Sequence, residues 1–195
     1  RRKNIPSLVD AYGRSEKLQR KTNLTLVLGC RDNTSKLDSQ QRDVFQKIFE
    51  IIDKYNLYGK VAYRKKHSPA NIPSLYRWAA SSGGIFVNPA LTEPFGLTLL
   101  EASSCGLPII ATDDGGPKEI HAKCENGLLV DVTDINQLKI ALEKGISNSS
   151  QWKLWIRNGI EGVHRHFSWN THVRNYLSIL QGHYEKSTIV SSSGI

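Results

Sequence analysis

The sequence predicts an α/β protein built on a doubly wound parallel sheet, and two observations carry this prediction. Short apolar runs alternate along the chain with longer segments that have a helical period. The runs, such as 24–29 and 108–112, are apolar throughout rather than alternately apolar and polar. Such runs are typical of parallel strands that helices cover on both faces.

The elements follow from these patterns in chain order. For the first half of the chain we expect a helix over 4–20, a strand over 24–29, a helix over 39–55, a strand over 60–63 and a helix over 72–80. For the second half we expect strands over 84–88, 108–112 and 128–131, with helices over 96–105, 117–121, 134–146, 150–166 and 168–183. Asp134 is expected to cap the helix that it begins.

The length of 195 residues suits one domain, which we assign to residues 1–185. The remaining segment, 186–195, has too little apolar content to pack and is expected to be a linker or disordered tail. The composition contains no Met and the chain starts abruptly at Arg1. We therefore expect an excised fragment.

The composition argues against several classes of function. The formal charge of +8 is spread over 1–21, 60–66 and 157–174 without the aromatic residues that stack on bases, so we expect no nucleic-acid partner. No apolar run is long enough to cross a membrane. The three cysteines form no C-x-x-C pair, which favours a reducing compartment and argues against a metal site.

The segment 86–101 is the most informative part of the chain. An apolar strand leads into a turn containing Gly96, and a helix then begins, with Glu93 before it and Glu101 about two turns inside it. The N–H groups at the start of a helix are unpaired and attract anions. Gly96 would allow a ligand to approach the backbone closely. The spacing E-x7-E therefore predicts a grip on a nucleotide sugar.

These residues also carry a resemblance to a known family. Glu93–Glu101, with 106–108 and 111–120, resembles the retaining glycosyltransferases of the GT-B fold, glycosyltransferase family 4. Further blocks are similar to the sucrose-phosphate synthases within that group: 23–26 with Arg31 and Asp32, 52–63, 72–77, 126–131 and 167–169.

The resemblance implies the Rossmann-like C-terminal lobe of a GT-B enzyme, which binds the donor. In that family a strand and an Arg-containing loop precede the position of Arg1, so the resemblance also implies a fragment that lacks the first strand of its sheet. Such enzymes transfer glucose from UDP-glucose to fructose 6-phosphate in the cytosol, giving sucrose 6-phosphate and UDP with retention at the anomeric carbon. The resemblance implies no cofactor and no obligatory metal. The acceptor would be held by an N-terminal lobe that this chain lacks, so we expect the isolated chain to be inactive.

The resemblance also implies roles for single residues. Lys3 and Glu93 match catalytic positions: Lys3 would bind the diphosphate and Glu93 would contact the transferred hexose. Glu101 would accept hydrogen bonds from the ribose hydroxyls. The residues Phe95, Gly96, Leu97 and Thr98 would meet the donor at the mouth of the helix.

The uracil base would lie against the backbone at Arg64 and Lys65, just past a strand end. The resemblance leads us to expect two neighbouring histidines there, whereas this chain has Lys66 and His67.

Other interpretations stay open at this stage. The same fold could serve another acceptor, as in sucrose synthase, or form a basic module that binds nucleic acid or protein without catalysis. Gly115-Gly116-Pro117 is explained equally well as a plain connection from a strand to a helix. We expect the four tryptophans to be packing residues and assign no role to the histidines.

Overall fold

A computed structural model describes residues 2–29, 33 and 36–192. Cys30, Arg31 and Asp32 lie outside the described residues, as does the end of the expected tail, 193–195. The described strands are all parallel and lie in two sheets. Their bounds are β1 Leu24–Leu26, β2 Val61–Tyr63, β3 Phe86–Asn88, β4 Ile109–Thr112 and β5 Gly127–Val130. The predicted α/β class with a parallel sheet is confirmed.

The sequence predicts one continuous sheet, whereas the described strands form two separate sheets. β1 pairs with β2, with Leu26 opposite Tyr63, and β4 lies between β3 and β5. Within the described residues, no strand joins β1 to β3. A hollow of about 1210 Å³ is lined by residues from both of these strands. β1 ends at Leu26, opposite the last residue of β2, which is three residues earlier than the predicted run 24–29.

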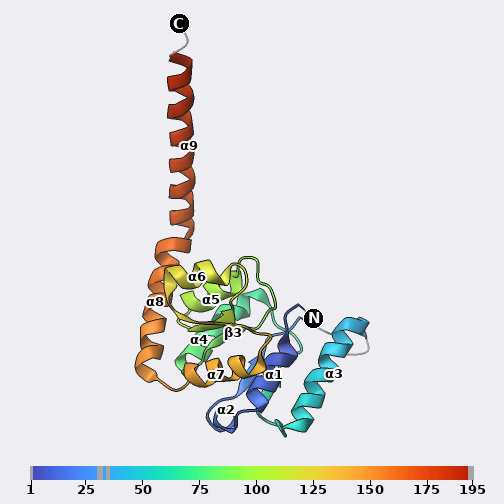
Figure 1. Cartoon of the computed structure of the whole chain (residues 1–195). Helices are drawn as coiled ribbons and strands as arrows, with labels where there is room; N and C mark the ends of the chain where they lie inside the picture. Colours follow the sequence, from blue (N-terminus) through green and yellow to red (C-terminus); the bar gives the residue numbers. More distant parts are fainter. Residues whose placement is uncertain (1, 30–32, 34–35, 193–195) are drawn as a thin grey trace.

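Helices pack around the sheets, and Figure 1 shows the last one projecting from the body. Their bounds are α1 Ile5–Gly13, α2 Glu16–Lys21, α3 Ser39–Lys54, η2 Pro69–Asn71, α4 Ile72–Ser81, α5 Leu97–Ser104, α6 Pro117–Cys124, α7 Ile135–Gly145, α8 Ser149–Phe167 and α9 Trp169–Ser192. Asp134 caps α7 as predicted, accepting hydrogen bonds from Asn136 N–H and Gln137 N–H.

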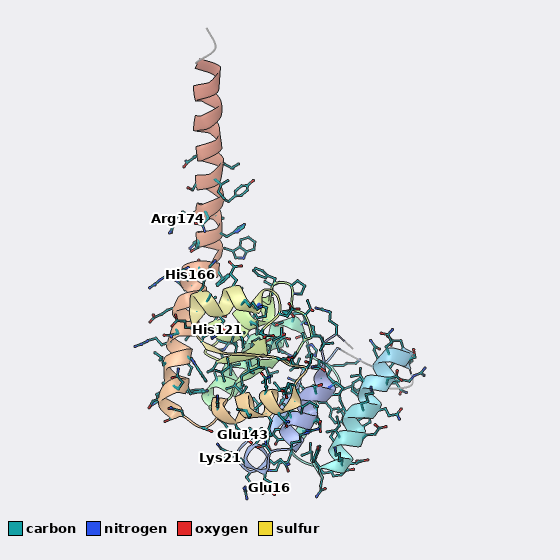
Figure 2. The ribbon with its side chains drawn as sticks, in the orientation of Figure 1. Glu16, Lys21, His121, Glu143, His166 and Arg174 are labelled. Carbon is teal, nitrogen blue, oxygen red and sulfur yellow. The ribbon has the colours of Figure 1, made fainter. Side chains whose placement is uncertain are left out.

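The helix predicted over 4–20 is wrong as a single element, because it breaks at Ser15. Ser15 has extended torsions and its hydroxyl accepts a hydrogen bond from Leu18 N–H, which makes it the N-cap of α2. The same hydroxyl donates to Glu143 of α7 at 2.6 Å. Figure 2 shows Glu143 at the same end of the molecule as Glu16 and Lys21 of α2.

Two apolar clusters cover opposite faces of the sheet β3-β4-β5. Ile110 belongs to the cluster with α1, α3 and α7, whereas Ile109 and Ala111 belong to the cluster with α5 and α6. All four residues of β4 are buried. This arrangement explains why the strands read as continuous apolar runs, since neighbouring side chains enter separate cores.

The segment expected to be a linker from Lys186 is helical as far as Ser192. The prediction rested on low apolar content, which argues against packing but not against a helix. The segment 169–192 contains no proline, so no residue of this kind ends α9 at 183, where the predicted helix stops. The division of the chain at residue 185 stays a prediction.

Two of the tryptophans do not pack as expected. Trp169 at the start of α9 is 81% exposed and Trp78 on α4 is 61% exposed. Their helical spacing predicted that they would pack with core residues. In the structure neither side chain belongs to or packs against a core cluster. Trp152, in contrast, is half-buried and its indole N–H donates to the Gly84 carbonyl at 3.0 Å, which joins α8 to the entry of β3.

Replacing Leu138 by alanine should destabilise the fold by about 2–5 kcal/mol, because this fully buried side chain of α7 would leave a cavity. Urea unfolding followed by circular dichroism measures the change. Ile140 on the same helix is 47% exposed and provides the matched control. Its replacement by alanine should change the free energy of unfolding by less than about 0.5 kcal/mol. Equal losses in both variants would contradict the assignment of this core.

Candidate functional site

The loop after β3 is fixed against the loop after β4. Glu93 forms an isolated parallel bridge with Gly115, and the Glu93 carbonyl accepts a hydrogen bond from Gly116 N–H at 2.8 Å. A Cβ atom at Gly115 would lie 2.3 Å from the Glu93 carbonyl oxygen, and one at Gly116 would lie 2.3 Å from that of Phe95. The two glycines are thus required for the contact. The sequence pattern left a plain connection and a functional turn equally open, and it did not reveal this contact.

Gly96 stands at the start of α5 in a left-handed conformation, with φ of 97°. Its Cβ would lie 2.9 Å from Leu99 Cδ1 and 3.0 Å from Ile120 Cδ1. Torsion and packing therefore both favour glycine here. This reason is separate from the close approach of a ligand, which stays a prediction.

The N-terminal segment lies across the loop that holds Glu93. The Arg2 carbonyl accepts a hydrogen bond from Leu91 N–H at 2.9 Å, and the Arg2 guanidinium donates to the Thr92 carbonyl at 3.2 Å. Next to it, Lys3 Nζ lies 2.8 Å from Glu93 Oε2 and forms an ion pair. The structure therefore brings together the two predicted catalytic residues, which are 90 positions apart in the chain. Sequence reasoning missed the contribution of Arg2.

The environment of Glu93 favours its charged form. Partial burial is the largest influence and acts to raise the pKa of this carboxyl. Hydrogen bonds from Lys3 and Asn88, together with the positive charges of Lys3 and Arg2, outweigh burial and hold the pKa below its ordinary value. Glu93 is therefore a fixed negative charge at neutral pH, only 13% of whose side chain is exposed.

Glu101 lies on the exposed face of α5 and lines two adjoining hollows. The smaller one has a volume of about 590 Å³ and is also lined by His67, Tyr76, Arg77 and Cys105. Burial, followed by the charge of Glu101, raises the pKa of Tyr76 to about 12, so its hydroxyl keeps its proton. The larger hollow, between the two sheets, is lined by Lys3, Thr98 and Glu101 among others. These three predicted residues therefore face one space.

The other predicted residues do not all lie in the same place. Phe95 is 49% exposed and Leu97 is 63% exposed at the mouth of α5. The first hydrogen bond in this turn is donated by Leu99 N–H to the Gly96 carbonyl at 2.9 Å. Arg64 and Lys65 directly follow β2 and are exposed, but they line neither hollow.

Several features of the described residues bear on other kinds of site. Within them, no three His, Cys, Asp or Glu side chains stand close enough together to hold a metal ion. No helix in the described part of the chain has the length and apolarity needed to span a membrane. Nε2 of His121 lies 3.1 Å from the Gly127 carbonyl oxygen, which gives it a structural contact (Figure 2). In Figure 2 Lys21 lies at the foot of the body and Arg174 lies on the lower part of the projecting helix α9, so these two charges form no common patch.

Comparison with known proteins decides the family. The family model described as "Glycosyl transferases group 1" matches residues 1–162. The chain belongs to this family. A curated relative, sucrose-phosphate synthase 4 of Arabidopsis thaliana, is 46% identical over 177 residues, which are 91% of this chain. The chain spans only 17% of that relative's length.

Solved structures of glycosyltransferases share the fold. The sucrose-phosphate synthase from Thermosynechococcus elongatus superposes with a TM-score of 0.72 and 27% identity, covering 97% of this chain and 43% of that one. Anabaena HepE, solved in complex with UDP and glucose, has a TM-score of 0.75 at 20% identity. It covers 93% of this chain and 45% of its own. The expected GT-B architecture is thereby confirmed for the fragment.

Replacing Lys3 by methionine should raise the pKa of Glu93, because a hydrogen bond and a positive charge are removed while burial remains. The ¹³C chemical shift of the Glu93 carboxyl, followed against pH, measures this change. Lys123→Met is the matched control, since it breaks the exposed ion pair with Glu119 and leaves Glu93 untouched. An unmoved Glu93 midpoint in Lys3→Met would contradict the ion pair.

The same pair predicts a dependence of stability on pH. Because the pKa of folded Glu93 lies below its ordinary value of 4.5, its contacts stabilise the fold above pH 4.5. This contribution is lost as the pH falls through the folded-state pKa. Stability should therefore fall less steeply on acidification in Lys3→Met than in the unaltered chain, as urea midpoints measured between pH 7 and pH 3 would show.

Proposed function

We propose that this chain is the donor-binding lobe of a sucrose-phosphate synthase. The enzyme containing it would transfer glucose from UDP-glucose to fructose 6-phosphate, giving sucrose 6-phosphate and UDP. The observation that carries the proposal is the position of Lys3, which pairs with Glu93 and lines one hollow together with Glu101. The sequence relationship to named sucrose-phosphate synthases and the fold shared with UDP complexes of Anabaena HepE support it.

The leaving diphosphate is the group that most needs stabilisation in this reaction. Negative charge grows on its oxygens as the bond to glucose breaks, and fixed positive groups lower the barrier. Lys3 supplies a cation, and the first N–H groups of α5, at Leu97 and Thr98, supply the positive end of a helix. The exposed Lys3 side chain can turn from Glu93 towards a phosphate oxygen.

The two carboxylates would contact the two sugars of the donor, which lie on either side of its diphosphate. Glu93 is charged at neutral pH and would face the hexose, where a carboxylate stabilises the positive charge developing at the anomeric carbon. Glu101 would accept hydrogen bonds from the two ribose hydroxyls. Glu93 lies in the loop before α5 and Glu101 lies about one helical turn inside it, so the two could meet different parts of one ligand. Phe95 and Gly96 complete the mouth between them.

The base would lie beyond the ribose, towards the end of β2. Arg64 and Lys65 would meet the uracil through their backbone groups, as the resemblance implies. His67, two residues after Lys65, lines both hollows together with Glu101. The smaller hollow is therefore the space that we assign to the uridine.

The acceptor belongs to a part of the enzyme outside this chain. Fructose 6-phosphate would be held by an N-terminal lobe, and the reaction would take place in the cytosol without an obligatory metal. We expect the isolated chain to bind UDP-glucose but not to transfer glucose. Formation of sucrose 6-phosphate by the chain alone would contradict the assignment of the acceptor site to another lobe.

Isothermal titration with UDP tests the donor site. Glu101→Ala should weaken binding on the order of 10- to 100-fold, because hydrogen bonds to a charged group are lost. Glu161→Ala, which removes an exposed carboxylate from α8, is the matched control and should bind UDP like the unaltered chain. Equal affinity in both variants would contradict the ribose contact.

Two further measurements separate the alternatives. An enzyme that contains this lobe should use fructose 6-phosphate in preference to fructose; the reverse preference would indicate a sucrose synthase. A short oligonucleotide that bound more tightly than UDP and was released by salt would instead indicate a nucleic-acid module.

A further inference from the structure

Asn88, the last residue of β3, is a buried polar side chain beside the site. Its side chain is 5% exposed, and its Cα is paired with that of Ala111 in β4. Both ends of its amide are satisfied, since Oδ1 accepts from Ala90 N–H at 3.2 Å and Nδ2 donates to Glu93 Oε2 at 3.1 Å. These two partners fix which way the amide faces, because the N–H of Ala90 can only donate a hydrogen bond and the carboxylate of Glu93 can only accept one.

Two donors converge on one oxygen of the Glu93 carboxylate. Lys3 Nζ lies 2.8 Å from Oε2, and Asn88 Nδ2 lies 3.1 Å from the same atom. No donor among the described residues forms a hydrogen bond with the other oxygen, Oε1. One oxygen is therefore anchored in the protein, and the other is available to a hydroxyl group of a ligand.

The two donors differ in how firmly they are held. Lys3 is 52% exposed on a long, flexible side chain, whereas Asn88 is fixed in a strand and in its own turn. A cation that turns to bind phosphate gives up part of its contact with the carboxylate. The amide of Asn88 is neutral, so a phosphate group would attract it far less than it attracts the charged Lys3. Its hydrogen bond is thus the contact that persists when Lys3 moves.

We propose that Asn88 is a positioning residue, which anchors Oε2 of Glu93 so that Oε1 stays directed at the hexose while Lys3 engages the diphosphate. The inference rests on the proposed function. Asn88 acts through Glu93 and need not touch sugar or phosphate itself. It would determine how well the lobe distinguishes UDP-glucose from UDP, since Glu93 is proposed to contact the hexose.

The test combines a titration of Glu93 with two binding measurements. The charged groups that face this carboxyl are Lys3 and Arg2, and Asp114 lies nearby, where it accepts a hydrogen bond from Thr92. In Asn88→Ala these groups are unchanged, so loss of the amide should raise the Glu93 pKa. UDP affinity should stay unchanged, while UDP-glucose affinity should fall on the order of 2- to 12-fold.

Thr112→Val is the matched control at the neighbouring strand end. The Thr112 hydroxyl accepts from Asp114 N–H at 3.2 Å, just as Asn88 Oδ1 accepts from Ala90 N–H two residues on. This variant loses an equivalent turn contact without touching the Glu93 carboxyl. It should lower thermal stability while leaving the Glu93 pKa and the affinity for both ligands unchanged.

Asn88→Asp keeps the turn acceptor and the size of the side chain, so it covers the case in which Asn88→Ala fails to fold. It replaces the donor by a second carboxylate and should raise the Glu93 pKa further. A Glu93 pKa unmoved in every folded Asn88 variant overturns the proposal, as does unaltered discrimination between UDP-glucose and UDP. Failure of the unaltered chain to bind UDP would count instead against the proposed function.

Discussion

The contact between the loops that follow β3 and β4 is the constraint on which the site depends. Parallel pairing brings the ends of the two strands to one edge of the sheet, and the bridge between Glu93 and Gly115 fixes the loops there. Any side chain at Gly115 or Gly116 would collide with the backbone of residues 93–95. The position of Glu93 and the direction in which α5 begins both follow from this contact.

The electrostatics of the site depend on a segment far away in the sequence. Residues 2 and 3 lie across the loop at 91–93 and supply the cations that keep Glu93 charged. Without a ligand, the cation and the carboxylate neutralise one another. In the proposed function a diphosphate would compete with Glu93 for the same lysine, so donor binding would change the environment of this carboxylate through one ion pair.

Apolar runs and helical periods were enough to predict the type and order of most elements. Their failures have local causes. The break at Ser15 depends on a hydroxyl that caps α2, and serine is common enough inside helices that the sequence alone does not reveal it. The extent of α9 was underestimated because a lack of apolar residues is informative about packing and not about backbone conformation.

The candidate site was predicted in part. Glu93, Gly96 and Glu101 stand in one short motif, and the resemblance added Lys3. The contributions of Arg2, Asn88 and Gly115 depend on contacts between segments that are distant in sequence or on the pairing of strand ends. A polar residue that ends an apolar strand, as Asn88 does, was the available signal, because ligands gather at the carboxyl ends of parallel strands.

The packing of α8 against α6 has a chemical consequence. A Cβ atom at Gly162 would lie 2.7 Å from the sulfur of Cys124, so the helix backbone shields this thiol directly. Burial raises the pKa of Cys124 to about 11, which keeps its sulfur protonated and unreactive while the two helices stay together. An alkylating reagent would modify Cys124 only in molecules where α8 has separated. The rate of that labelling would therefore report how often this part of the fold opens.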